Sequence, residues 1–295
     1  MFEFKGVFSK LLFILLSLIV INPTYGQDNI KAKDVDKFVR SLMPEVWEKR
    51  TVDGYKIGDP ETEITGIAVT WMATYEVIEK VIENKCNLIV THEPTFFNHR
   101  DEIEDFKNDP TYIKKRKLLE EHNIVVYRIH DSWDLYPEYG IQDSFAKQLG
   151  LSKIATQFSQ NRPEITGLNS IFEIEPTTLN DFVRIVKQKM GHPSLRVVGD
   201  LNNKIKKIGL GFGGWGSSFS IFQDCMRLGA DVYVAGEMTE WSILRYAEAA
   251  GKCVIVVGHT RSETAGMQNC ANFLSMHFPN IKIIFLDAGD PYIYF

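Results

Sequence analysis

A histidine followed four residues later by an acid occurs twice in the chain, each time just after an apolar, β-branched run. The first pair is His130 and Asp134, and the second is His259 and Glu263. Imidazole nitrogens mixed with carboxylate oxygens are typical ligands of Zn²⁺, Mn²⁺, Fe²⁺ and Co²⁺. Residues four apart in an extended strand lie about 13 Å apart, so each pair can meet in one site only if the chain turns after the histidine.

A second acidic element repeats upstream of these pairs. Residues 90–95 read Val-Thr-His-Glu-Pro-Thr and residues 234–239 read Val-Ala-Gly-Glu-Met-Thr. This alignment places Glu93 opposite Glu237, with His92 beside Glu93. Because both elements recur in the same order in the two halves of the chain, they indicate an internal repeat.

Converging carboxylates raise one another's pKa unless a cation lies between them. Two divalent ions about 3.5–4 Å apart, bridged by a carboxylate or hydroxide, are typical of hydrolytic sites. We therefore expect two divalent metal ions at the strand ends, with the choice among Zn, Mn, Fe and Co left open. The candidate site residues are His92, Glu93, His130, Asp134, Glu237, His259 and Glu263.

Other interpretations apply to single residues of these types. Glu237 can instead cap a helix that begins near residue 240. The glycine-rich residues 211–216 match neither the P-loop nor the dinucleotide-binding spacing, so they predict a tight strand-to-helix turn with backbone amides near the site. The remaining histidines are interpreted as hydrogen-bonded structural residues: His99, His122, His192 and His277.

Alternating strands and helices must bring these side chains together. Short β-branched runs predict strands at residues 66–69, 88–91, 124–129, 171–175, 208–211, 232–235, 254–257 and 281–286. Helical spacing of apolar residues predicts helices at residues 28–49, 75–84, 112–122, 144–149, 179–189, 218–228, 240–250 and 264–277. This alternation is typical of an α/β protein, in which ligand-binding groups collect at the carboxyl ends of strands.

The bulk composition narrows the possible classes of function. The chain has 295 residues, 44% hydrophobic and 24% charged, as in ordinary globular proteins. Its formal net charge of -5 offers no electrostatic attraction for a nucleic-acid backbone, so we expect no nucleic-acid partner. The cysteines form no Cys-x-x-Cys pair and lie in or beside apolar stretches, which predicts buried free thiols at Cys86, Cys225, Cys253 and Cys270.

Residues 1–26 have the pattern of a secretory signal peptide. Lys5 and Lys10 precede an apolar run of about a dozen residues, which is short for a membrane span of roughly 20 residues. The small residues Thr24 and Gly26 predict cleavage before Gln27. We therefore expect an exported protein, periplasmic or secreted, without a stable membrane anchor.

Three short blocks in a fixed order carry a family resemblance. They read Ile89-Val90-Thr91-His92-Glu93-Pro94, His130-Asp131-Ser132-Trp133-Asp134 and Gly258-His259-Thr260-Arg261-Ser262-Glu263. With these blocks the chain resembles the dinuclear-metal family known as GTP cyclohydrolase I type 2, or Nif-three-like, over most of residues 35–295. The resemblance implies two intertwined strand–helix–strand repeats with mixed β-sheets, and a homo-oligomer that is usually a hexamer.

The resemblance also implies roles for individual residues. The family's first block usually reads His-His-Pro with both histidines as ligands, whereas this chain has Glu93 after His92. An anionic ligand at that place lowers the Lewis acidity of the metal. His130 and Glu237 would lie beside the site, where they can act as general base or acid. The implied metal ligands are His92, Glu93, Asp134, His259 and Glu263, with Glu263 bridging.

The repeats also divide the chain. We expect a signal peptide at residues 1–26, a first α/β repeat at 27–140, a connecting segment at 141–205 and a second repeat at 206–295.

The predicted function is that of an exported dinuclear metal-binding protein, a metal-dependent hydrolase that attacks a small polar substrate with a metal-bound water. A GTP cyclohydrolase-like ring-opening enzyme is one alternative. It rests on the resemblance alone, and export argues against it because nucleotide pools are cytosolic. A non-catalytic metal-binding or interaction protein is the other alternative, because a fold does not establish a function.

Overall fold

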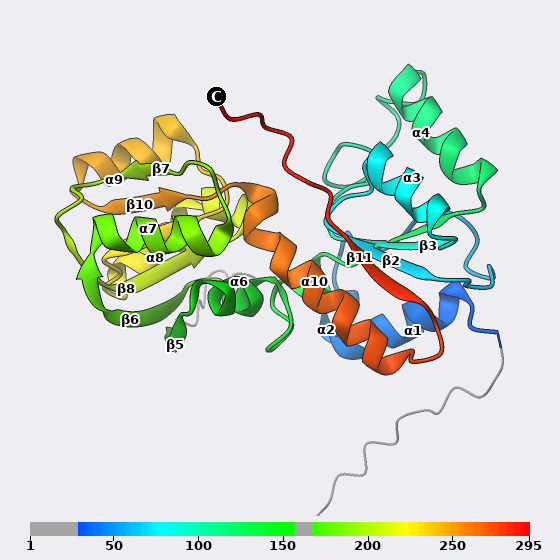
Figure 1. The fold of residues 1–295 in the computed structure, drawn as a ribbon, viewed down its shortest axis with the longest axis horizontal. Coiled ribbons are helices and arrows are strands. Elements are labelled where there is room, and N and C mark those ends of the chain that lie inside the picture. The colour runs from blue at the N-terminus through cyan, green and yellow to red at the C-terminus, as the bar shows by residue number, and fades with distance from the viewer. Residues whose placement is uncertain (1–28, 157–166) are drawn as a thin grey trace, which may run out of the picture.

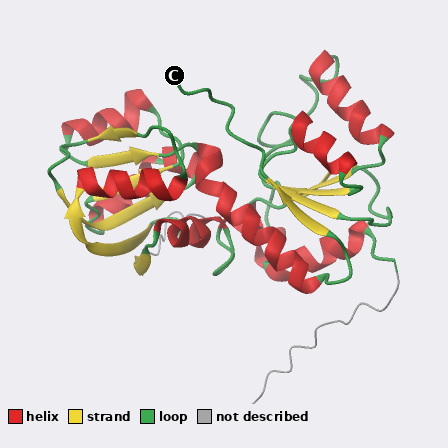
Figure 2. Cartoon of the chain, viewed as in Figure 1, coloured by secondary structure: helices red, strands yellow, loops and turns green. Residues whose placement is uncertain are grey.

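Two mixed β-sheets with helices packed on them form the molecule (Figures 1 and 2). The computed structural model describes residues 29–156 and 167–295, so the predicted signal peptide lies outside the described residues. The α/β architecture with mixed sheets is confirmed.

The first sheet has the strand order β1-β4-β3-β2-β11. Its strands are β1 (Gly54–Ile57), β2 (Ile67–Thr70), β3 (Leu88–Thr91), β4 (Val125–Arg128) and β11 (Ile283–Leu286). All neighbours are parallel except β1, which pairs antiparallel with β4. The helices of this part of the chain are α1 (Ala32–Leu42), α2 (Pro44–Trp47), α3 (Tyr75–Glu83), α4 (Pro110–Glu121) and α5 (Asp131–Asp134).

Alternate residues along the strands of the first sheet face two separate apolar clusters. Ala68, Ile89 and Val126 pack with residues of α3 and α4 on one face. Their neighbours along the strands pack with α1 and belong to the larger core that continues into the second sheet. Because β2, β3 and β4 are buried at every position, they read in the sequence as unbroken apolar runs rather than as an alternating pattern.

The second sheet has the strand order β5-β6-β8-β9-β10-β7. Its strands are β5 (Ser152–Thr156), β6 (Ser170–Thr178), β7 (Arg196–Val198), β8 (Lys204–Gly211), β9 (Val232–Ala235) and β10 (Cys253–Val256). Strands β8, β9 and β10 are parallel, and the outer strands pair antiparallel. The other helices are α6 (Ile141–Leu149), α7 (Leu179–Met190), α8 (Phe219–Arg227), α9 (Arg245–Ala249) and α10 (His259–His277), with a 3-10 helix η2 (Gly213–Ser217) and a π-helical turn η3 (Glu240–Leu244).

The end of the chain joins the two sheets. Helix α10 starts directly after β10 of the second sheet and crosses to the first, where β11 pairs with β2 (Figure 1). The two halves are therefore intertwined as predicted, because the last strand of the chain belongs to the first sheet. Residues 141–205, expected to connect the repeats, supply β5, β6 and β7 to the second sheet. The proposed division of the chain into domains stays a prediction.

A glycine sets the start of α10. Gly258 has φ 100°, a conformation that only glycine adopts without strain, and it turns the chain from β10 into the helix. His259 is therefore the first residue of a helix, and Glu263 follows one turn later. The turn that the His-x-x-x-acid spacing required is this first helical turn.

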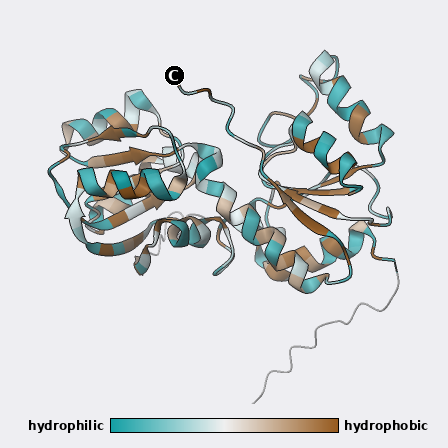
Figure 3. Ribbon diagram, in the orientation of Figure 1, coloured by the Kyte–Doolittle hydropathy of each residue, from teal (hydrophilic) through white to brown (hydrophobic). Residues whose placement is uncertain are grey.

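Hydropathy follows the layers of the fold. The strands are the most hydrophobic segments, and the helices carry polar residues on their outer faces (Figure 3). Cys86, Cys225, Cys253 and Cys270 are all buried and free, which confirms the expectation for the thiols. Within residues 29–156 and 167–295, no helix combines the length and the hydropathy that a bilayer span requires.

Candidate metal centre

Three strand ends from both sheets deliver the predicted ligands to one place. His92 and Glu93 follow β3, and His130 follows β4 at the start of α5, which ends at Asp134. Helix α10 brings the two ligands of the second half. Both His-x-x-x-acid pairs therefore turn through helical backbone, as their spacing required.

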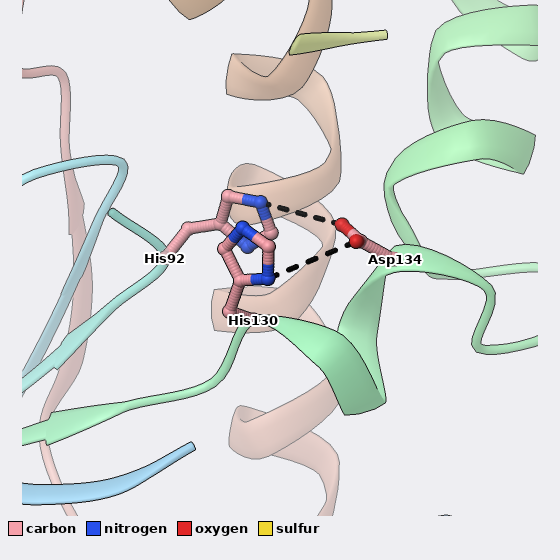
Figure 4. Close-up of side chains that lie close together, drawn as sticks. All are labelled: His92, His130 and Asp134. Carbon is pink, nitrogen blue, oxygen red and sulfur yellow. Dashed lines mark ion pairs between the residues drawn. The ribbon is translucent and has the colours of Figure 1, made fainter. Parts of the chain in front are cut away.

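The ligand atoms lie close enough to share cations. His92 Nε2 is 3.4 Å from Asp134 Oδ1 and 3.6 Å from Glu263 Oε2. His259 Nε2 is 3.3 Å from both Glu93 Oε1 and Glu263 Oε2. Two overlapping groups, His92–His130–Asp134 and His92–Glu93–Glu263, place their ligand atoms within 4.8 Å of one another. Figure 4 shows the first group, in which both imidazoles face the Asp134 carboxylate.

Unpartnered polar atoms test whether these residues fit a metal. His92 Nε2, Asp134 Oδ1 and His259 Nε2 are buried and make no hydrogen bond. A buried polar atom without a partner costs about 1–3 kcal/mol. His92 Nε2 lies 3.4 Å from Asp134 Oδ1, and His259 Nε2 lies 3.3 Å from carboxylate oxygens of Glu93 and Glu263, so divalent cations held among these side chains would satisfy the three atoms. The buried His, Asp and Glu side chains therefore fit a metal ion.

The other ring nitrogen of each histidine is held by an oxygen. His92 Nδ1 lies 3.1 Å from the backbone oxygen of Ile129, and His130 Nδ1 lies 2.9 Å from Asp131 Oδ1. His259 Nδ1 lies 3.5 Å from Glu237 Oε2. Oxygen partners of this kind fix the tautomer and the ring orientation of metal-binding histidines.

Two tryptophans hold carboxylates of the opposite half. The indole N–H of Trp71, which follows β2, donates to Glu263 Oε2 at 2.7 Å. The indole N–H of Trp215, in η2, donates to Asp134 Oδ2 at 3.0 Å. Each half of the chain thus fixes a candidate ligand that the other half supplies.

A fully buried arginine supports the first loop of ligands. Arg128, at the end of β4, donates from Nε to the backbone oxygen of His92 at 2.7 Å and from Nη1 to that of His99. Its Nη2 lies 3.8 Å from Glu93 Oε2. This cation therefore stands beside the Glu93 carboxylate.

The glycine-rich segment packs directly against the site. A Cβ atom at Gly213 would lie 1.8 Å from Glu263 Oε1 and 2.7 Å from His259 Nε2. The Gly213 amide donates to Ser262 Oγ at 2.9 Å rather than pointing to open space. The segment is the predicted tight turn, and glycine lets its backbone approach the ligands.

Burial and neighbouring charges shift the pKa values of the cluster in opposite directions. Burial lowers the pKa of His92 to about 4, and burial raises that of Asp134 to about 7. Burial alone would lower the pKa of His130, but the carboxylates of Asp134 and Asp131 raise it to about 9. Perturbed values of this kind cluster at functional sites.

An open cleft of about 590 Å³ lies over the ligands. Glu93, His130, Glu237, His259 and Glu263 line it, whereas His92 and Asp134 are buried beneath. Glu237 is half-buried at the cleft with its carboxylate beside His259 Nδ1, whereas the N-cap of η3 is Thr239, without a side-chain hydrogen bond.

Several residues of the site carried no recognisable signal in the sequence. Trp71, Trp215 and Phe97 read as ordinary apolar residues, and all three line the cleft. His99, interpreted as structural, also lines the cleft, with its ring centroid 5.4 Å from that of His130. Asp131 stands inside a predicted block, so its place next to His130 could have been noticed.

The comparison with protein-family models decides the family. The model of Duf34/NIF3 (NGG1p interacting factor 3) matches residues 30–291. The chain belongs to this family. A protein of Clostridium perfringens named "GTP cyclohydrolase 1 type 2 homolog" is 30% identical to this chain over 237 residues, which cover 79% of this chain and 87% of that protein.

Solved structures share the NIF3 fold. A Bacillus cereus protein related to NIF3 has a TM-score of 0.75 at 18% identity, with 91% of this chain and all of that chain covered. Reduced HcgD from Methanocaldococcus jannaschii has a TM-score of 0.67 at 26% identity, covering 88% of this chain and 98% of its own. These likenesses confirm the fold that the three sequence blocks predicted.

Proposed function

We propose that this NIF3-family chain is a metal-dependent hydrolase of a small polar substrate. One observation carries the proposal: buried, unpartnered imidazole and carboxylate atoms from both sheets converge at the floor of an open cleft. Such a cluster serves no evident packing role, because each unpartnered atom destabilises the fold. The loss of stability that the cluster causes is explained if it holds metal ions at a site that substrates can reach.

Five residues would hold two divalent ions in this proposal. They are His92, Glu93, Asp134, His259 and Glu263, and Glu263 lies between the two histidines, within 3.6 Å of His92 Nε2 and 3.3 Å of His259 Nε2. Divalent ions in mixed His/carboxylate sites acidify water and polarise carbonyl or phosphoryl oxygens. The ligand chemistry suits Zn, Mn, Fe and Co alike and does not select one of them.

His130 is the proposed proton carrier. Asp131 holds its Nδ1, which leaves Nε2 turned toward Glu93 Oε1 at 3.7 Å on the cleft side. From there His130 can take a proton from an attacking group or give one to a leaving group. Glu237, at the edge of the same cleft, is the second candidate for proton transfer and also fixes the orientation of His259.

A panel of generic esters, amides and phosphodiesters tests the proposal. We expect turnover that disappears on chelation and in His259→Ala, and that falls about 10²–10⁴-fold in His130→Gln. His277→Gln is the matched control, because His277 contacts the backbone oxygen of Phe273 far from the ligands. If metal-loaded protein shows no turnover that His259→Ala removes, the chain is not a hydrolase.

We also propose export and assembly, both from the sequence. Residues 1–26 support cleavage before Gln27, so protein recovered from the periplasm of a Gram-negative host should begin at Gln27. The family resemblance supports a homo-oligomer, expected as a hexamer in light scattering. An uncleaved N-terminus, or a monomeric mass, would contradict the respective proposal.

A further inference from the structure

The cleft over the ligands has the size of a small-molecule site but an unusual lining. Its volume of about 590 Å³ lies within the range of small-molecule pockets. Beyond the ligands and their partners, its walls are mainly apolar, with Trp71, Met72, Pro94, Phe97 and Trp215. These walls decide which part of a substrate the cleft can hold.

The two tryptophans offer the cleft only their carbon surfaces. Each indole N–H is already donated to a carboxylate, Glu263 for Trp71 and Asp134 for Trp215. An indole whose single donor is used this way interacts with a ligand through its ring, by stacking or edge contact. Both rings stand at the cleft on opposite halves of the chain.

Phe97 is held at the cleft in a strained conformation. Its φ is 71°, a region that a bulky residue adopts only where the surrounding structure requires it. Phe97 is 44% exposed, although its ring lies against Phe106 and has Lys115 Nζ 4.9 Å from its centroid. An exposed aromatic ring kept in a costly conformation beside a ligand cluster indicates a binding role.

Carboxylates complete the lining of the cleft: Glu93, Asp131, Glu237 and Glu263. The divalent ions of the proposed function would offset these charges, so the net charge of the lining does not by itself select among ligands. The apolar walls are what distinguish this cleft.

We propose that the cleft binds a small ligand through a planar aromatic ring, with the ring against Trp71, Trp215 and Phe97 and a polar group toward the ligand cluster. Only the placement of that polar group rests on the proposed function.

Two amides that differ only in their ring test the proposal. We expect metal-loaded protein to bind benzamide at least fivefold more tightly than cyclohexanecarboxamide in calorimetry. Phe97→Leu keeps apolar bulk and should bring the ratio close to one, whereas Trp241→Leu, at an 84% exposed tryptophan outside the cleft, should leave it unchanged. Equal or undetectable binding of the two amides overturns the proposal.

The test measures binding, so benzamide preference without any turnover contradicts only the hydrolase, and turnover without ring preference contradicts only this inference.

Discussion

His92, His130 and His259 differ in the oxygen that holds Nδ1, and the difference sets their chemistry. A neutral backbone carbonyl holds His92, which is buried, whereas carboxylates stand beside the other two rings. A carboxylate partner raises the basicity of an imidazole, and a carbonyl does so less. We therefore expect His92 to act as a ligand only, and proton transfer to fall to His130, which lines the cleft.

The indole donors should affect metal affinity without changing the ligand set. Trp71→Phe and Trp215→Phe keep an aromatic ring and remove the N–H that fixes Glu263 or Asp134. We expect each to weaken metal binding by about 10-fold or more, as for other partners of metal ligands. Competition with a fluorescent chelator measures this, with Trp241→Phe as the control. Unchanged affinity in both variants would show that the indoles only fill space.

Lys115 makes stability depend on pH in a defined window. It is buried in α4 and donates from Nζ to the Thr95 backbone oxygen at 2.6 Å. This hydrogen bond connects α4 to the loop after Glu93. Burial lowers its pKa from 10.5 to about 8. Between these two values the unfolded chain binds more protons than the folded chain, so stability rises with pH.

The wild type should therefore gain stability relative to Lys115→Met as the pH rises from 7.5 to 10.5. The gain expected from the pKa shift is up to about 3 kcal/mol in the free energy of unfolding, measured by urea denaturation at each pH. Lys117→Met changes an exposed lysine of the same helix and should follow the wild type. Parallel pH curves for the wild type and Lys115→Met would mean that Lys115 stays charged throughout.

At the scale of elements, the glycine-rich 3-10 helix η2 limits the space beside the candidate ligands. Gly213→Ala would place a methyl group 1.8 Å from Glu263 Oε1. Gly251→Ala is a matched control, since Gly251 has φ 64° and no atom within 4 Å of the added Cβ. Both changes strain the backbone by about 1–2 kcal/mol, but only Gly213→Ala should lose most of the bound metal. Normal metal content in Gly213→Ala would contradict the placement of Glu263 as a ligand.

The elements predicted from sequence are those with unbroken apolar runs. Strands β3 and β9 have the expected bounds, because burial on both faces leaves such runs. Strands β1, β5 and β7 were missed, since they are short edge or outer strands with polar residues. Helix α5 was missed too: it depends on Asp53, which accepts hydrogen bonds from the amides of His130, Asp131 and Ser132.

The site was predictable only where a residue type implies chemistry by itself. Histidines and acids at strand ends stand out, and the structure brings His92, Glu93, Asp134, His259 and Glu263 together. Trp71 and Trp215 act through contacts with residues 192 and 81 positions away, and no local pattern encodes such contacts.

At the scale of the whole molecule, the site lies where the two sheets are joined. Ligands come from the first sheet and from α10, which starts in the second sheet and leads to β11 in the first. A metal bound here links segments distant in the chain and relieves the repulsion among buried carboxylates. Metal binding should therefore stabilise the whole fold rather than one loop.

Chelation tests this coupling. A metal present at 100 times its dissociation constant stabilises the folded state by about 2.7 kcal/mol. For a chain of this size we expect EDTA to lower Tm by roughly 5–10 °C, and added metal to restore it. His259→Ala should lack the difference between the two conditions. An unchanged Tm in the wild type would mean that no metal contributes to the native state.

The metal content of the purified protein tests the two-metal centre most directly. Elemental analysis of wild-type protein, prepared without chelator and with Zn, Mn, Fe and Co available, should give close to two divalent ions per chain. His92→Ala and Glu263→Gln should each hold fewer, with Glu263→Gln losing more because Glu263 faces both His92 and His259. Fewer than one ion per wild-type chain would contradict the dinuclear centre.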